Sequence, residues 1–85
     1  MYYLYILLGN KENWHYIGIT DNLERRLIEH NSGKVKSTKP YRPYKIIYTE
    51  TFDSKTLARK RELFLKKTAK ARIELFSNLP PSSSG

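Results

Sequence analysis

The chain has 85 residues, and its 16 Lys and Arg against 8 Asp and Glu give a formal net charge of +8. This length suits one domain with a single small core. The sequence contains no cysteine, which excludes disulfides, thiolate metal sites and a thiol nucleophile. The basic balance favours polyanionic partners, although a basic surface can also serve solubility alone.

The apolar run at residues 2–8 predicts a first strand because it is rich in aromatic and branched side chains. It is too short for a membrane span and has no basic segment before it, so we expect neither an anchor nor a signal peptide, and a cytoplasmic protein. Gly9, Asn10 and polar residues 11–13 then predict a hairpin turn to a second strand from Trp14 to Ile19.

A first helix is expected after Thr20 and should extend to about Asn31. Asp21 followed by Glu24 indicates a capping box, and Leu23 and Leu27 have helical spacing. Gly33 would end the helix, since glycine tolerates the left-handed conformation found there. Residues 34–43, rich in lysine and with two prolines, predict an exposed basic loop.

The remaining segment predicts one strand and two helices. We expect a strand over residues 44–51, a helix capped by Asp53 or Ser54, and a shorter helix over residues 71–76. The fold would be α+β, a small sheet covered by helices in the order β-β-α-β-α-α. It would occupy residues 1–78, and the Pro, Ser and Gly content of residues 79–85 predicts a disordered tail.

Glu62 is a candidate metal ligand because it borders the apolar stripe of the second helix, where a carboxylate needs a partner. The alternative is an ordinary salt bridge to Arg59, Arg61 or Lys66 on the same helix. With only His15 and His30 available as imidazole ligands, a hard cation fits better than zinc. Mg²⁺ needs only one or two carboxylates, because water and phosphate oxygens complete its shell.

Arg26 and His30 stand four residues apart and should share one face of the first helix. Arg26 could offer a planar fork to a phosphate. His30 could bind phosphate when protonated or relay a proton when neutral. The alternative is a solvated face, which Arg25 and Glu29 illustrate as an expected exposed ion pair.

Tyr5 and Tyr16 should lie near each other on adjacent antiparallel strands. They could be ordinary strand tyrosines that pack one face of the sheet. A tyrosine that acts as a base near neutral pH needs a cation to lower its pKa, which is ordinarily about 10. Arg26 and a metal on Glu62 could supply this charge, and Gly18 would let a phosphate backbone come close.

The joint pattern resembles the GIY-YIG nuclease family, in particular its small standalone bacterial members, from about residue 2 to residue 76. The resemblance is carried by Tyr3-Leu4-Tyr5, the continuous run 16–27 with Tyr16-Ile17-Gly18 and Arg26, the run 30–33, and the segment 58–67 that contains Glu62. Tyr3 stands where the family usually has glycine. Asn78 is the candidate for an asparagine that follows the glutamate helix in many relatives.

The resemblance implies a three-stranded antiparallel sheet and phosphodiester hydrolysis with one divalent metal, Mg²⁺ or Mn²⁺. Tyr16 would assist deprotonation of the attacking water, and Tyr5 would position that water or the phosphate. Arg26 would stabilise the developing charge, Glu62 would hold the metal, and His30 would stand near the leaving group. The implied function is an endonuclease acting on DNA, in repair or recombination, and RNA is left open as an alternative substrate.

The basic loop would add nucleic-acid contacts through Lys34, Lys36, Lys39, Tyr41 and Arg42, with Gly18 beside them. Two other functions fit the same residues. One is a nucleic-acid-binding module without turnover, and the other is an adaptor whose basic face meets an acidic protein.

Overall fold

The computed structural model describes residues 1–10 and 14–78, where three strands form one antiparallel sheet. The strands are β1 (Tyr2–Gly9), β2 (His15–Thr20) and β3 (Tyr44–Phe52), in the spatial order β2-β1-β3. The second strand begins one residue later than predicted and the third extends one residue further. The predicted turn at 11–13 and tail at 79–85 lie outside the described residues.

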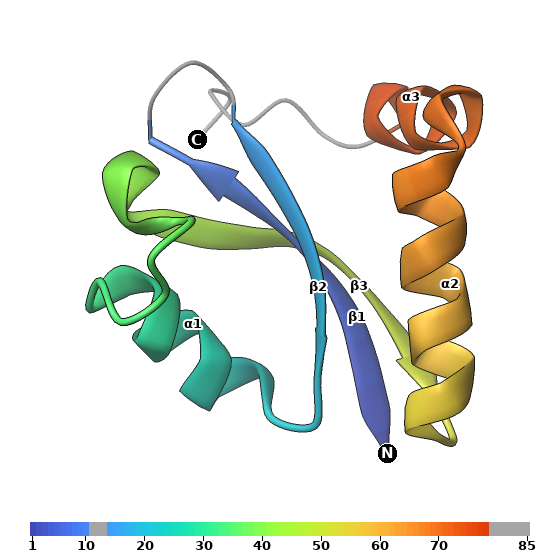
Figure 1. Cartoon of the computed structure of the whole chain (residues 1–85), viewed down its shortest axis with the longest axis horizontal. Helices are drawn as coiled ribbons and strands as arrows, with labels where there is room; N and C mark the ends of the chain where they lie inside the picture. Colours follow the sequence, from blue (N-terminus) through green and yellow to red (C-terminus); the bar gives the residue numbers. More distant parts are fainter. Residues whose placement is uncertain (11–13, 79–85) are drawn as a thin grey trace.

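Helices cover both faces of this sheet (Figure 1). Because successive strand residues point to opposite faces, Tyr5 and Leu7 of β1 pack toward helix α1 (Leu23–Asn31). Leu4 and Ile6 pack on the other side, toward α2 (Lys55–Lys67) and α3 (Ala69–Ser77). The predicted α+β class and element order are confirmed.

The N-terminus of α1 differs from the prediction. Asn22, and not Asp21, is the N-cap: its side-chain oxygen accepts a hydrogen bond from the Arg25 backbone N–H at 3.0 Å. The Thr20 hydroxyl oxygen accepts from the Asn22 N–H at 3.1 Å, which moves the start of the helix one residue along. Asp21 instead pairs with the Arg25 guanidinium at 2.7 Å, so the predicted capping box is wrong.

The end of α1 agrees with the prediction. The helix ends at Asn31, and Gly33 follows with a φ of 85° in the left-handed region. The segment 34–43 is more ordered than the loop we predicted, because it contains a short 3-10 helix, η1 (Lys39–Tyr41). It is anchored by fully buried Thr38, whose carbonyl accepts a hydrogen bond from the Tyr44 hydroxyl at 2.8 Å.

Ser54 caps α2, and its hydroxyl oxygen accepts from the Leu57 N–H at 3.3 Å. Helix α3 begins earlier and ends later than predicted. It follows α2 directly after Thr68, and the Arg72 guanidinium satisfies two C-terminal carbonyls of α2 at 2.9 and 3.0 Å. None of the helices in residues 1–10 and 14–78 is long and apolar enough to cross a membrane.

Asn31 fastens the end of α1 to the start of β3. Its side-chain oxygen accepts from the Tyr44 backbone N–H at 2.6 Å, and its side-chain nitrogen donates to the Tyr44 carbonyl at 3.1 Å. Replacing one partner of such bonds leaves partly buried backbone groups unpaired. The position of α1, and of every residue it carries, therefore depends on this side chain.

We expect Asn31→Ala to lower the free energy of unfolding by about 1–3 kcal/mol, measured by urea denaturation. Asn31→Asp keeps an acceptor for the Tyr44 N–H and should lose less. Lys60→Ala, on the exposed side of α2, is the control and should unfold like the parent. Equal midpoints for Asn31→Ala and Lys60→Ala would contradict this role.

Candidate active site

Tyr5 and Tyr16 lie on the α1 face of the sheet with ring centroids 6.2 Å apart. In the register of β1 and β2, Tyr5 stands opposite Gly18 and Tyr16 stands opposite Leu7, so the two phenols are diagonal neighbours. A Cβ atom at residue 18 would lie 2.6 Å from the Tyr5 hydroxyl oxygen. Glycine is therefore required here to seat the Tyr5 ring, and any contact of Gly18 with phosphate stays a prediction.

Arg26 and His30 both reach the Tyr5 hydroxyl from successive turns of α1. The Arg26 Nε donates to this oxygen at 3.4 Å, and the His30 Nε2 lies 3.0 Å from it. The other ring nitrogen, Nδ1, lies 2.8 Å from the Thr38 hydroxyl oxygen. The predicted shared face is confirmed, and its meeting point is a phenol on the sheet.

The hydrogen bonds around His30 assign its tautomer. The Thr38 hydroxyl donates to the Val35 carbonyl at 3.3 Å, so its oxygen accepts from the His30 Nδ1–H. The Nε2 atom is then unprotonated and accepts the Tyr5 hydroxyl proton, while the Tyr5 oxygen accepts from Arg26. The hydrogen bonds therefore all run in one direction. They start at the Arg26 donor, pass through Tyr5, His30 and Thr38, and end at the Val35 carbonyl.

The pKa values of these side chains agree with the hydrogen-bond directions. Burial raises the pKa of Tyr5 to about 12, although the hydrogen bond from Arg26 acts in the opposite sense. Burial, assisted by the Arg26 charge, lowers the pKa of His30 to about 4. Burial alone would lower the pKa of Arg26, but hydrogen bonds with Glu29 and Tyr5 outweigh it and raise this pKa. At neutral pH, Tyr5 is protonated, His30 is neutral and Arg26 is charged.

These protonation states bear on the roles that the sequence left open for His30 and Tyr5. A neutral His30 favours a proton relay over phosphate binding, which needs the protonated ring. Tyr5 keeps its proton and is unsuited to act as a base. His30 is fully buried and Tyr5 is 2% exposed, whereas Tyr16 is only partly buried. Of the two phenols, Tyr16 is the one with more access to a molecule at the surface.

The charged groups on α1 form the predicted Arg25–Glu29 ion pair and a second, shorter one between Arg26 and Glu29. Glu29 lies 3.0 Å from the Arg26 Nη1 and 4.0 Å from the Arg25 Nε, so its closer partner is Arg26. The hydrogen bond from Arg26 lowers the pKa of Glu29. Arg26 is therefore held from two sides, by a phenol and by a carboxylate.

Glu62 is 7% exposed and lies in the apolar stripe of α2, between fully buried Ala58 and Leu65. Its Oε2 accepts a hydrogen bond from Lys66 at 3.0 Å, and Arg59 approaches Oε1 only to 3.8 Å. The Oε1 atom is buried without a hydrogen-bond partner. The predicted ion pairs with Arg59 and Lys66 are thus both present, but the longer one leaves Oε1 without a hydrogen bond.

Arg61, the third expected partner of Glu62, faces elsewhere. It binds Glu50 on β3 through two hydrogen bonds of 3.0 and 3.1 Å. This bidentate pair fixes the rotation of α2 against the sheet edge. It therefore helps to hold Glu62, the next residue, in the helix face that meets the sheet.

Glu62 belongs to the same site although α2 covers the opposite face of the sheet from α1. The Lys66 Nζ that binds Glu62 also lies 5.9 Å from the centre of the Tyr16 ring. Burial raises the pKa of Tyr5, and the Glu62 charge makes a small addition in the same direction. Lys66 therefore connects Glu62 on α2 to Tyr16 on β2.

A divalent cation fits this site through a single protein ligand. The described residues contain no group of three or more His, Asp or Glu side chains that could enclose a metal ion. The unpartnered Oε1 of Glu62 offers one hard oxygen ligand. Such a site suits Mg²⁺, which commonly retains several waters and takes substrate oxygens.

The predicted nucleic-acid contacts lie on and beside η1. Lys34, Lys36, Lys39 and Arg42 are exposed, as expected. The Tyr41 ring stacks on Trp14 with centroids 4.6 Å apart and 6° between planes, and Trp14 lies 6.3 Å and 21° from Tyr16. An aromatic row thus connects Tyr16 to the basic segment.

Sequence reasoning missed Trp14, Thr38 and Lys66. The position of Trp14 two residues before Tyr16 predicts the same strand face and was the available signal for it. No sequence signal pointed to Thr38, because its contact with His30 depends on how the chain returns to the sheet. Lys66 was recognised only as a salt-bridge partner.

The second histidine, His15, and the candidate asparagine, Asn78, lie away from the Tyr5 cluster. His15 stacks on Phe76 with centroids 4.5 Å apart, on the face of α3. Asn78 is exposed at the end of α3, and its side-chain nitrogen donates to the Glu74 carbonyl at 3.0 Å. The structure therefore gives Asn78 a local contact and no contact with Glu62.

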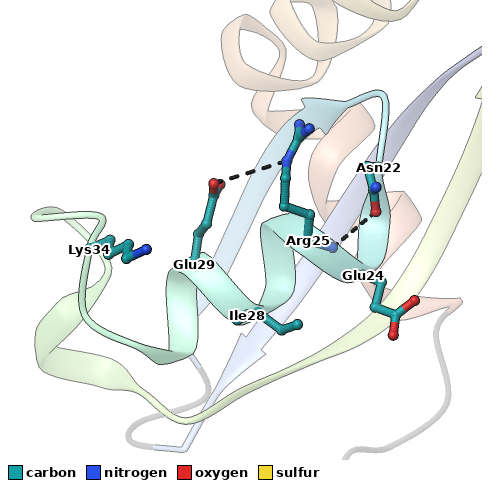
Figure 2. A pocket seen from close by; sticks show the side chains of 6 residues that line it. All are labelled: Asn22, Glu24, Arg25, Ile28, Glu29 and Lys34. Carbon is teal, nitrogen blue, oxygen red and sulfur yellow. Dashed lines mark hydrogen bonds and ion pairs between the residues drawn. The ribbon is translucent and has the colours of Figure 1, made fainter.

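A separate hollow of about 350 Å³ lies on the outer side of α1 (Figure 2). Its rim combines acidic and basic side chains with Ile28, which is 63% exposed. None of the five candidate catalytic residues lines it. We assign the chemistry to the cluster around Tyr5 and not to this hollow.

The pKa of His30 gives a pH dependence of stability. The unfolded chain takes up a proton near pH 6.5, but the folded chain does so only near pH 4. The stabilising contribution is therefore complete above about pH 6.5 and is lost as the pH falls toward 4. We expect the unfolding free energy to fall over this range, and His30→Gln to flatten that fall. A His30 imidazole that titrates near 6.5 by NMR would contradict this assignment.

The chain is similar in sequence to a known catalytic domain and to several known proteins. The GIY-YIG catalytic domain matches residues 1–74. The chain is 39% identical over 74 residues to a UPF0213 protein of Natronomonas pharaonis, covering 86% of each chain. It is 42% identical over 81 residues to a UPF0213 protein of Syntrophus aciditrophicus, covering 92% of each.

A solved structure gives the same result for the fold. The solution NMR structure of a UPF0213 protein from Bacillus halodurans aligns with a TM-score of 0.56 and 34% identity, covering 91% of this chain and 84% of that one. Its likeness agrees with the three-stranded antiparallel sheet and three helices described above. The chain belongs to the GIY-YIG catalytic domain family.

Proposed function

We propose that this protein is a divalent-metal-dependent endonuclease that hydrolyses phosphodiester bonds of DNA. One observation carries the proposal: two phenols, a guanidinium and a buried carboxylate with an unpartnered oxygen converge from four elements. The family match supports nuclease chemistry at such a cluster. RNA is the alternative substrate, and a role in repair or recombination is part of the proposal.

Glu62 would hold the metal, Mg²⁺ or Mn²⁺, through Oε1, the oxygen that has no hydrogen-bond partner. When bound, the ion would polarise the scissile phosphate and lower the pKa of a coordinated water. Lys66 binds the other oxygen and holds the carboxylate in place.

Arg26 is the residue that would stabilise charge on the phosphate. Its guanidinium stays charged, and its planar fork suits an oxyanion that gains charge in the transition state. The hydroxyl of Tyr5 fixes the Nε edge of this group at 3.4 Å. Tyr5 is therefore placed to orient the phosphate or the attacking water.

Tyr16 would assist deprotonation of the attacking water, as the family resemblance implies. It is more exposed than Tyr5, and the Lys66 ammonium lies 5.9 Å from its ring. His30 lies behind Tyr5, fully buried. It would act as a positioning residue that holds the Tyr5 proton and thereby leaves the Tyr5 oxygen to Arg26.

The basic segment would bind the nucleic-acid backbone. Lys34, Lys36, Lys39 and Arg42 are exposed near the aromatic row that ends at Tyr41. Such surfaces bind phosphates with a strong salt dependence and can stack on unpaired bases.

Glu62→Gln should abolish Mg²⁺-dependent cleavage, with a loss of about 10²-fold or more, because the carboxylate ligand is removed. DNA affinity in EDTA, without divalent cations, should remain within about twofold of the parent, since the other phosphate contacts are retained. Cleavage of linear, branched and single-stranded DNA is measured with Mg²⁺ or Mn²⁺. Glu74→Gln, on exposed α3, is the matched control and should cut normally.

The outcomes distinguish three functions. A binding module would retain salt-dependent DNA affinity but cut none of the substrates. An adaptor would neither bind nor cut nucleic acid. Cleavage by Glu62→Gln at the parental rate would refute the proposed metal site.

Arg26→Lys should lower kcat about 10²-fold or more, because an ammonium keeps the charge but cannot replace the planar donor fork. Arg25→Lys is the matched control, since Arg25 is exposed and pairs with Asp21. Single-turnover cleavage rates of both variants are compared at saturating DNA. Equal rates would show that Arg26 only contributes charge.

A further inference from the structure

A cavity of about 270 Å³ opens between β2 and the junction of α2 with α3. Its walls come from segments at both ends of the chain. Aromatic rings and two cations provide most of the lining: Trp14, His15, Tyr16, Lys66, Arg72 and Phe76. The sequence analysis assigned no function to four of these residues, namely Trp14, His15, Arg72 and Phe76.

The lining suits a flat aromatic ligand that carries negative charge. His15 and Phe76 are stacked on each other, 4.5 Å and 17° apart, so this pair of parallel rings is already an aromatic stack that a further ring could extend. Arg72 is held in place by its bonds to the carbonyls of Leu65 and Lys66. A nucleobase attached to its phosphate combines the two properties, because every base has a face for stacking and every phosphate attracts a cation.

The cavity is continuous with the active site. Tyr16 lines the cavity and also lies 6.2 Å from the Tyr5 ring. Lys66 lines it too, and its ammonium group binds Glu62 at 3.0 Å. A nucleotide in the cavity would therefore place its phosphate beside the proposed metal ligand.

The volume limits what can enter. Pockets for drug-sized molecules usually measure about 300–1,000 Å³, so 270 Å³ corresponds to a small occupant such as one base. A base that is paired and stacked in a duplex cannot enter without being extruded, which costs a few kcal/mol. Unpaired nucleotides avoid this cost.

We propose that this cavity, named here the base cavity, binds an unpaired nucleobase next to the scissile phosphate. The protein then prefers single-stranded DNA, or unpaired positions in branched DNA, over intact duplex. This inference rests on the proposed nuclease function, which it refines by naming the substrate class. Trp14 is the single tryptophan of the chain and lines the cavity, so its fluorescence reports occupancy.

The test measures binding in Ca²⁺ by fluorescence anisotropy and by Trp14 emission. A short single-stranded oligonucleotide is compared with the blunt duplex of the same sequence. We expect the single strand to bind at least about fivefold more tightly and to change the Trp14 emission, since stacking of one base contributes about 1–3 kcal/mol. An abasic site is then moved along the strand, and we expect one position to abolish this preference.

Phe76→Leu removes the stacking face but keeps an apolar side chain, and it should lose the single-strand preference. Phe64→Leu, on exposed α2 outside the cavity, is the matched control. Equal affinity for single strand and duplex, or no sensitive abasic position on the unmodified protein, overturns the base cavity. Because binding is measured without cleavage, these results do not depend on whether the protein cuts DNA.

Discussion

The hydroxyl of Tyr5 is the point on which the rest of the site depends. It lies 3.0 Å from His30 and 3.4 Å from Arg26, and it exists in this position only because residue 18 has no side chain. A group with both a donor and acceptors can join two side chains from α1 only if it is held rigidly. The central strand β1 provides this rigidity, since Tyr5 lies in its buried part.

Glu62 shows a different constraint. A carboxylate that is only 7% exposed costs free energy unless both oxygens accept hydrogen bonds. In Glu62 only Oε2 does so. The Arg61–Glu50 pair holds the helix that carries it, so Glu62 cannot rotate into water without moving α2. An incomplete set of partners in a rigid position is what a ligand-binding carboxylate requires.

Much of the fold could be predicted from the sequence because its elements carry local signals. A continuous apolar run rich in aromatic and branched residues marked β1, and Gly33 marked the end of α1. The start of α1 was wrong by one residue because the Thr20 hydroxyl oxygen accepts from the Asn22 N–H, and Asn22 rather than Asp21 becomes the cap. The 3-10 helix at Lys39–Tyr41 was missed because its order comes from the distant contacts of Thr38.

The candidate site was predictable as a set of residues but not as a network. Spacing alone placed Arg26 and His30 on one face, and the hairpin placed Tyr5 near Tyr16. Tertiary contacts and burial, which no local pattern contains, determine the rest. They set the tautomer of His30, keep the proton on Tyr5 and leave one oxygen of Glu62 without a hydrogen bond. The protonation states in particular follow from how deeply each group is buried.

The two proposed ligands of the site, a phosphate and a divalent cation, would each meet a side chain that is already ion-paired. Without substrate, Glu29 neutralises Arg26 and Lys66 neutralises Glu62. A phosphate must compete with Glu29 for the Arg26 fork, and a cation must share Glu62 with Lys66. Each proposed ligand would thus meet a charge of its own sign, Glu29 for the phosphate and Lys66 for the cation. A phosphate that binds together with the cation would also gain Lys66 as a partner, so the proposed ligands would bind more favourably together than apart.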